Sequence, residues 1–401
     1  MAGYRDVLRT PGVGRIIAAQ LTARFPNGMI SLAVLLYIEH VTGSYGAAGL
    51  VLAATSIGQA IAGPVTSRWM GIWGMRRVLT ITLVVCALAI TTLALVEMPV
   101  PVYMALGLVI GLSTPPIQSA ARTIYPKLVS ARMLTPLFSL DASLQEIIWI
   151  VAPVVITLVA TQVGTVQALL LIVVVLAGGG AWFILSPEVG RVRIPRSRRS
   201  LGKVLTKPPV LLATVIGFLL IGACAAVEAG VVSTFGHGGL EAGIVLALFS
   251  VGSLAGGLSF GHIPIGPWAM ARRLAIVTIG LSLTMLSLQV WWLGGTLVLA
   301  GIGIAPALAV LFAMTSASVK FSDTAEAFGW VATGQLIGAA AGSSIAGFLI
   351  DGVGPQGAYV AATGFAAVGL LVAIVFVRGF PDLRRRDPSP IPDTEPVPQI
   401  T

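Results

Sequence analysis

Residues 186–209 read SPEVGRVRIPRSRRSLGKVLTKPP, and they form the longest polar segment in the interior of the chain. The segment holds seven arginines and lysines and several prolines. Apolar stretches recur on both sides of it, and a helix needs about 20 apolar residues to cross the hydrocarbon core of a bilayer. The segment therefore divides the chain into two groups of membrane spans.

Twelve spans are predicted, six before this segment and six after it. Backbone amides find no water partner in lipid, so each apolar run is expected to be a helix. The expected spans are 13–38, 47–67, 78–97, 101–121, 137–161, 166–186, 210–234, 241–261, 273–292, 295–319, 327–350 and 358–378. The predicted fold class is an all-α integral membrane protein, in which 12 transmembrane helices form two pseudo-symmetric six-helix bundles.

Four regions follow from these spans. Residues 1–186 are expected to form the N-terminal bundle and residues 210–378 the C-terminal bundle. Residues 187–209 are expected as a basic cytoplasmic linker between them. Residues 379–401 are rich in proline and charge, so they are expected as a disordered cytoplasmic tail.

Composition excludes several classes of protein. The chain is 56% hydrophobic and 10% charged, whereas a soluble domain carries roughly 25% charged residues. The net charge of +9 comes from bases dispersed among loops, which favours contact with anionic lipid over a nucleic-acid partner. Cys86 and Cys224 lie inside apolar spans, so no disulfide or metal site is expected. No phosphate-cradling glycine-rich loop with a following lysine occurs, so neither ATP nor another cofactor is expected.

Basic residues occupy only every second connection between the spans. They are Arg5 and Arg9, then Arg68, Arg76 and Arg77, then Arg122, Lys127 and Arg132, then seven in the central linker, then Arg272 and Arg273, then Lys320, and finally Arg378 with Arg384, Arg385 and Arg386. Positive charge is enriched on the cytoplasmic side of membrane proteins. The pattern predicts a multi-pass protein of the cell membrane with both termini in the cytoplasm.

The two halves echo each other in sequence. Gly58 and Gly63 in the second span match Gly252 and Gly257 in the eighth, and each pair precedes a turn with two adjacent arginines. Two such halves facing each other are the architecture of transporters that rock around a central site.

The chain resembles the major facilitator superfamily from about Arg9 to Arg378. The family motif between its second and third helices reads roughly G-x-x-x-D-R-x-G-R-R, and residues 67–77 here read SRWMGIWGMRR. Gly74, Arg76 and Arg77 fit this motif, while Gly71 and Ile72 replace the Asp and the Arg. The resemblance implies a conformational loop in which that Asp helps to latch the outward-facing state. Another contact is therefore expected to replace the latch.

Two further stretches carry the resemblance. Ala152-Pro153 partly matches a Gly-Pro motif in the fifth helix of drug–proton antiporters of this family. Residues 323–330, DTAEAFGW, are similar to a group of bacterial members. The resemblance implies alternating access, and it implies a monomer.

Charges inside the spans are costly, so they are candidates for substrate binding or proton coupling. Arg24 and Glu146 both lie at a depth of roughly 15 Å by helical rise, so we expect them to pair, either as a mechanistic pair or as a structural bridge. Arg24 could also attract an anionic substrate. Asp141 is expected to pair with Arg122 structurally. Glu228 has no basic partner at its depth, so it is expected either as a proton carrier or as a protonated hydrogen-bonding residue.

Neutral polar side chains also fall within the spans. Any one of them could join two helices by a hydrogen bond, but as a set they favour a wet interior. They are Gln20, Asn27, Gln59, Gln118, Gln145 and Gln335.

The sequence as a whole predicts a secondary transporter of a small molecule that works by alternating access, with proton-coupled efflux. The substrate is not identified by these residues. A uniporter or an importer is the alternative. A membrane-embedded enzyme would need a nucleophile–base set or a metal cluster at one depth, and a receptor or scaffold would need a sizeable soluble domain. Neither feature is found, so the chain is not expected to be an enzyme.

Overall fold

The computed structural model describes residues 4–197, 200–236, 240–260, 263–384 and 388–393 of the 401-residue chain. The described residues are almost entirely helical, and their only β contact is an isolated bridge between Lys320 and Ile391. The α-helices are α1 Tyr4–Arg9, α2 Val13–Thr42, α3 Tyr45–Trp73, α4 Met75–Leu95, α5 Val100–Leu112, α6 Ile117–Leu128, α7 Ala131–Gln162, α8 Thr165–Leu185, α9 Pro187–Arg191, α10 Pro208–Phe235, α11 Leu240–Phe260, α12 Ala269–Leu283, α13 Val290–Ser318, α14 Phe321–Val353 and α15 Gln356–Val375. Three 3₁₀ turns complete them: η1 Lys203–Thr206, η2 Thr284–Leu286 and η3 Val377–Gly379.

Twelve of the helical segments are long and apolar enough to cross a membrane, which confirms the predicted fold class. The fourth span consists of α5 and α6, which together cover Val100–Leu128. The chain leaves the helix between them at Ser113–Pro116, because the prolines at 115 and 116 lack an amide hydrogen and restrict the backbone.

The predicted boundary between the ninth and tenth spans is wrong. The ninth span was expected to continue to residue 292, but it ends with η2 at Leu286, and α13 begins at Val290. The backbone amide of Leu293 already donates to the carbonyl of Gln289. Trp291 and Trp292 therefore lie in the first turn of α13 rather than at the end of the ninth span.

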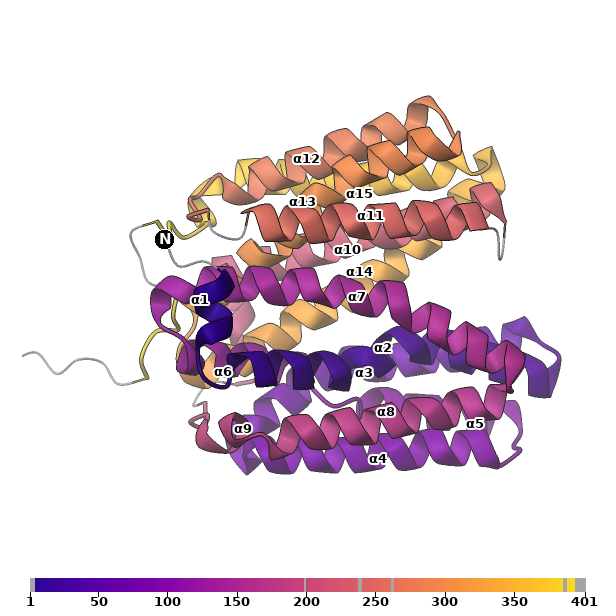
Figure 1. Ribbon diagram of the computed structural model, residues 1–401, viewed down its shortest axis with the longest axis horizontal. Helices are drawn as coiled ribbons and strands as arrows, with labels where there is room; N and C mark the ends of the chain where they lie inside the picture. Colours follow the sequence, from indigo (N-terminus) through magenta and orange to yellow (C-terminus); the bar gives the residue numbers. More distant parts are fainter. Residues whose placement is uncertain (1–3, 198–199, 237–239, 261–262, 385–387, 394–401) are drawn as a thin grey trace, which may run out of the picture.

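The helices form two bundles, which Figure 1 shows one above the other. Helices α2–α8 make the first and α10–α15 the second, and α7 and α14 run where the two bundles meet. The matching glycines of the two halves lie at equivalent helix crossings. A Cβ on Gly58 would lie 2.6 Å from the Leu108 carbonyl oxygen, and a Cβ on Gly252 would collide with the Val298 carbonyl. Glycine at both sites allows the backbones of the second and fourth spans of each half to touch.

The two ends of the molecule differ. We name the end that holds α1, α9, the linker and residues 380–384 and 388–393 the linker end, and the opposite end the far end. At the linker end α3 crosses α14, where Thr333 Oγ1 donates to the Ala60 carbonyl at 2.8 Å, and α7 crosses α11, where Ser139 Oγ donates to the Gly257 carbonyl at 2.7 Å. Every hydrogen bond and aromatic contact found between the bundles in the described residues lies in the linker-end half of its helices. The bundles are thus joined at the linker end.

Part of the expected disordered tail is ordered. Ile391 exchanges backbone hydrogen bonds with Val319 and Phe321 at 2.9 and 3.1 Å, and the Leu383 amide donates to Ile265 at 2.9 Å. Phe380 and Leu383 are buried against the second bundle, and this apolar burial offsets the cost of ordering a chain rich in proline and charge. The rest of the predicted disordered tail, residues 385–387 and 394–401, lies outside the described residues.

Candidate functional site

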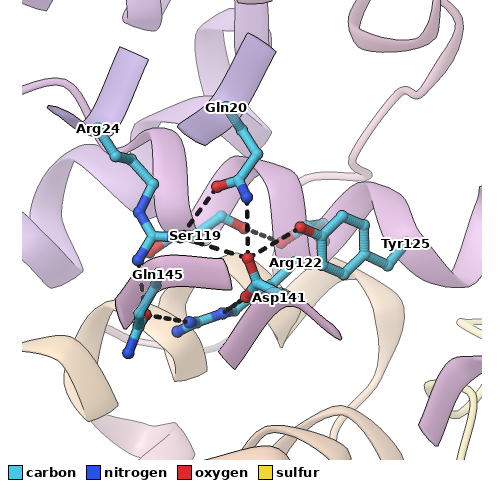
Figure 2. A network of polar contacts seen from close by, with 8 residues as sticks. Gln20, Arg24, Ser119, Arg122, Tyr125, Asp141 and Gln145 are labelled. Atoms are coloured by element: carbon cyan, nitrogen blue, oxygen red, sulfur yellow. Dashed lines mark hydrogen bonds and ion pairs between the residues drawn. The ribbon is translucent and has the colours of Figure 1, made fainter. Parts of the chain in front are cut away.

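A cluster of buried polar side chains lies where α2, α6 and α7 meet (Figure 2). Residues four apart lie on one face of a helix, so Gln20 and Arg24 of α2 face Asp141 and Gln145 of α7. Helix α6 contributes Arg122 after the proline break. All five side chains are at least nine-tenths buried.

Asp141 is the centre of this cluster. Its Oδ1 accepts from Gln20 Nε2 at 2.9 Å, from the Tyr125 hydroxyl at 3.2 Å and from Arg24 Nη1 at 3.3 Å. Its Oδ2 accepts from Arg122 Nε at 2.9 Å. The predicted pairing of Asp141 with Arg122 is confirmed. A buried carboxylate with four donors is stabilised in its ionised form.

Two amide side chains complete the contacts of the guanidinium groups. Arg24 donates to Gln20 Oε1 at 2.9 Å and to Gln145 Oε1 at 2.7 Å. Arg122 donates to Gln145 Oε1 at 3.4 Å, and with its amide oxygen turned toward Arg122, Gln118 accepts from Nη2 at 3.0 Å. The predicted polar residues Gln20, Gln118 and Gln145 therefore belong to one network.

Arg122 also reaches the second bundle. Its guanidinium carbon lies 3.3 Å from the ring centroid of Phe312 on α13, within the range of a cation–π contact. The Phe312 ring packs against Phe328, which in turn packs against Phe138 of α7. The polar cluster is thus coupled to the contact between the bundles at the linker end.

The cluster carries an excess of positive charge. Arg24 and Arg122 share the single carboxylate of Asp141, which leaves a net charge of +1. Both guanidinium groups are removed from water, so the excess charge is weakly screened. Such a site favours the approach of an anionic group.

The predicted Arg24–Glu146 pair is wrong. Arg24 pairs with Asp141, and Glu146 makes no ion pair in the described part of the chain. The depths agree, but one residue along a helix turns the side chain by about 100°. Gln145 faces α2, while Glu146 is directed to the second bundle, where Ser253 and Cys224 are its neighbours.

Glu228 lies one turn beyond Cys224 on α10 and has an exposed side chain. No ion pair of the described residues includes it. Cys224 lies within electrostatic reach of both carboxylates. Cys224 is therefore close to one acid of each bundle, and neither acid has an ion-pair partner in the described part of the chain.

The remaining predicted polar residues do not join the cluster. Asn27 is exposed on α2, with no hydrogen bond found for its side chain among the described residues. Gln335 lies on α14 against Gly217 of α10, and its buried Nε2 has no hydrogen-bond partner in the part of the chain described. Sequence periodicity places these residues in spans but does not show which face each helix turns to its neighbour.

An ion pair joins the bundles at the crossing of α3 and α14. Arg68 Nη1 lies 2.7 Å from Glu326 Oε2, and Glu326 Oε1 accepts from the Gly202 amide of the linker at 2.8 Å. The linker makes a second contact with α14, one turn before Glu326, where Ser197 Oγ donates to Asp323 Oδ1 at 2.6 Å. Arg68 precedes the expected conformational loop, so this ion pair stands near the place where the family Asp is missing.

The conformational loop itself has a different role. Gly74 adopts a φ of 90° between α3 and α4. Arg76 donates to the carbonyls of Ile184 and Ser186 at 3.0 and 3.2 Å, where α8 ends and leaves carbonyl groups without helical partners. Arg77 is exposed. In this conformation the motif arginine caps a helix.

Besides Arg68–Glu326, sequence reasoning missed a second ion pair at the linker end. Arg15 of α2 pairs with Glu188 of α9. Burial alone would raise the pKa of Glu188, but the hydrogen bond from Arg15 and its positive charge leave the pKa below its ordinary value. An arginine two residues into a predicted span was the available signal, since such a charge needs a partner near the membrane surface.

No metal site is found in the described residues: no three His, Cys, Asp or Glu side chains lie together there. His237 and His262 lie outside the described residues.

Comparisons with known proteins agree with the fold. The sequence matches the family described as "Major Facilitator Superfamily" over residues 16–296 and 225–399. The structure is similar to that of the human organic anion transporter MFSD10 (TETRAN), with a TM-score of 0.71 and 15% identity over 93% of this chain and 100% of that one. It is also similar to a bacterial homologue of the iron transporter ferroportin in an outward-facing state, with a TM-score of 0.72 and 14% identity over 90% of this chain and 98% of that one. The search of curated proteins gives no match.

Proposed function

Since the chain belongs to the major facilitator superfamily, we propose that it exports a small molecule across the cell membrane in exchange for protons, by alternating access. Members of this family are transporters, and the twelve apolar helices make this a multi-pass membrane protein. Proton coupling, the direction of transport and the cell membrane as location are the parts that we propose.

The orientation follows from charge. Basic residues accumulate at the linker end, so we assign this end to the cytoplasm. The bundles are joined at that end by the Arg68–Glu326 ion pair and by two hydrogen bonds. Thr333 donates to the Ala60 carbonyl, and Ser139 donates to the Gly257 carbonyl. A transporter closed at its cytoplasmic end is in the outward-facing state. The observation that carries the proposal is this one-sided set of contacts between two pseudo-symmetric bundles.

The substrate is proposed to carry a negative charge. The excess charge of the Arg24–Asp141–Arg122 cluster supports this, because an incoming anionic group would relieve the repulsion between two buried guanidinium groups. A protein of the same fold, MFSD10, is an organic anion transporter, which is the substrate class proposed here.

Glu146 and Glu228 are proposed as the proton carriers. Each is an acid without an ion-pair partner in the described residues, and they belong to opposite bundles. A carboxylate that is solvated in one state and desolvated in the other changes its proton affinity during the cycle. Asp141 is held ionised by two arginines, so it is the poorer candidate.

The test uses purified protein in proteoliposomes that enclose a pH-sensitive dye. A panel of organic anions is added under an imposed pH gradient, and a panel of organic cations is tested in parallel. We expect an anion to dissipate the gradient with wild-type protein but not with Glu146→Gln/Glu228→Gln. Transport of an anion without any proton movement would favour a uniporter, and transport of cations only would contradict the proposed substrate class.

A further inference from the structure

The second bundle has a basic hollow at its linker end that the transport mechanism does not use. It consists of a cavity of about 600 Å³ and an adjoining one of about 360 Å³, which share Pro267, Trp268 and Arg384 as lining residues. Arg272 lines the smaller cavity, and Arg378 lines the larger one. We call Trp268, Arg272, Arg378 and Arg384, with the space between them, the basic hollow.

Three parts of the chain build its walls. Trp268 and Arg272 stand at the start of α12, and Arg378 lies in η3 just after α15. Residues 380–384 form the third wall. A hydrogen bond of 2.9 Å from the Leu383 amide to the Ile265 carbonyl holds them in place. Asp382 fixes the Arg384 guanidinium through contacts of 2.9 Å to Nε and 2.6 Å to Nη2. The hollow is thus a formed part of the fold.

The basic hollow is positively charged. Among the described residues, Arg272, Arg378 and Arg384 stand against the carboxylate of Asp382, which gives a net charge of +2. Arg272 and Arg378 are exposed and belong to no ion pair found among the described residues. A guanidinium group presents paired N–H donors that match the oxygens of a phosphate. The hollow has the chemistry of a site for a phosphate group.

Its surroundings are apolar and face outward from the bundle. Trp268 is 52% exposed, and Val375 and Phe376, which precede η3, are 61% and 54% exposed. Such large apolar side chains at the end of a span lie against acyl chains, and tryptophan is enriched at the level of the lipid headgroups. A phosphate bound here would therefore have apolar chains attached to it.

We propose that the basic hollow binds the headgroup of an anionic phospholipid. The phosphodiester lies between Arg272 and Arg378, while Trp268 and the exposed end of α15 contact the acyl chains. Basic pockets between transmembrane helices on the cytoplasmic side are suited to such headgroups. The site rests on the membrane location of the chain and is independent of its substrate.

The test is native mass spectrometry of purified protein titrated with phosphatidylglycerol, with phosphatidylcholine as the zwitterionic comparison and glycerol phosphate as the soluble phosphate. Wild-type protein is expected to retain phosphatidylglycerol in preference to both. In the double variant Arg272→Gln/Arg378→Gln, the affinity for phosphatidylglycerol is expected to fall roughly 30-fold. The reason is that each basic residue near an anionic surface contributes about a fivefold factor to the binding constant. Arg9→Gln/Arg132→Gln removes two exposed arginines from the linker end of the first bundle and is expected to retain the lipid.

A second measurement covers the case in which the double variant does not fold. Brominated phosphatidylglycerol is expected to quench the fluorescence of Trp268, read as the difference between wild-type protein and Trp268→Phe, more strongly than brominated phosphatidylcholine does. Equal quenching by the two lipids, or equal phosphatidylglycerol affinity of Arg272→Gln/Arg378→Gln and wild-type protein, would overturn the proposal. Glycerol phosphate that binds as tightly as the lipid would reassign the hollow to a soluble phosphate.

Discussion

At the scale of single residues, one aspartate organises the buried charge of the first bundle. Asp141 accepts from two arginines, a glutamine and a tyrosine. Arg24 and Arg122 would repel each other without it. The side chain is therefore needed for the stability of the bundle as well as for the geometry of the proposed anion site.

Asp141→Asn is expected to destabilise the protein by about 3–5 kcal/mol, because it leaves two buried guanidinium groups without a counter-charge. Glu146→Gln is the matched control, because it removes a carboxylate five residues further along α7 that has no ion-pair partner in the described residues. Only a small change in the free energy of unfolding is expected for this variant. Thermal unfolding of both variants in detergent checks this difference. Similar melting temperatures for the two variants would contradict the assigned pairing.

A double-mutant cycle separates the two possible partners of Arg24. We expect Arg24→Gln and Asp141→Asn to couple by about 0.5–3 kcal/mol, and Arg24→Gln and Glu146→Gln to add independently. The cycle is read from the same unfolding curves. Coupling to Glu146 instead of Asp141 would restore the pair that helical depth alone suggests.

The proton-coupling residues are tested by removing their titration and keeping their shape. Glu228→Gln is expected to bind substrate with unchanged affinity in detergent but to lose accumulation driven by a pH gradient in proteoliposomes. The reason is that glutamine donates and accepts hydrogen bonds but carries no proton across. If Glu146→Gln and Glu228→Gln both still concentrate substrate, the coupling route through these two acids is excluded.

Sequence reasoning found every charge of this site but not every pairing. Four ionisable residues inside spans were recognisable because charge in lipid is costly. The partner of Arg24 was missed, because depth depends on residue count while direction depends on rotation about the helix axis. Arg15–Glu188 and Arg68–Glu326 were missed because each joins residues more than 170 positions apart, and no local pattern reports such a contact.

At the scale of helices, small residues and prolines decide where the elements touch. Around the prolines at 115 and 116, α5 ends and α6 begins. Gly63 meets Gly329 where α3 crosses α14: a Cβ on Gly63 would lie 3.1 Å from the Gly329 carbonyl oxygen. The twelve spans followed from hydrophobicity alone, but the docking of Leu383 and Ile391 did not, because single backbone hydrogen bonds leave no compositional signal.

Glu326→Gln is expected to weaken the closed linker end, because it removes the ion pair with Arg68. Spin labels at Arg132→Cys and Ile263→Cys report this end, since both positions are exposed and belong to opposite bundles. On a Cys86→Ser/Cys224→Ser background, double electron–electron resonance should show a larger fraction of long distances in Glu326→Gln than in the parent. Arg77→Gln, an exposed arginine of the same loop region, is expected to leave the distribution unchanged. An unaltered distribution in Glu326→Gln would show that this ion pair is not the latch.

At the scale of the whole molecule, the distribution of charge and the distribution of contacts agree. The end that carries the basic connections is also the end where the two bundles are joined, and the linker contributes to that junction through Gly202 and Ser197. Because the linker contacts Glu326 and Asp323 of α14 directly, motion of one bundle relative to the other must also move the linker.

Orientation in the membrane is the simplest prediction at this scale. Reporter fusions at Ser197 and at the C-terminus are expected to report the cytoplasm, and a fusion at Ser287, between the ninth and tenth spans, is expected to report the outside. The alternation of basic connections is the physical reason. A Ser197 fusion that reports the outside would invert the assignment of the linker end.

Alternating access requires that the two ends open in turn, and one paired distance measurement tests this directly. Labels at Arg132→Cys and Ile263→Cys follow the linker end, and labels at Val163→Cys and Leu286→Cys, exposed at the far end of opposite bundles, follow the other. The distance within each pair is measured in nanodiscs under two changes. In the first, the pH is lowered to protonate Glu146 and Glu228; in the second, Glu326→Gln removes the Arg68–Glu326 ion pair. The account predicts that the far-end distance shortens whenever the linker-end distance lengthens. The fraction of molecules with a long linker-end distance and the fraction with a short far-end distance should rise in equal proportion. Distances that stay fixed at both ends, or that lengthen together, would contradict it.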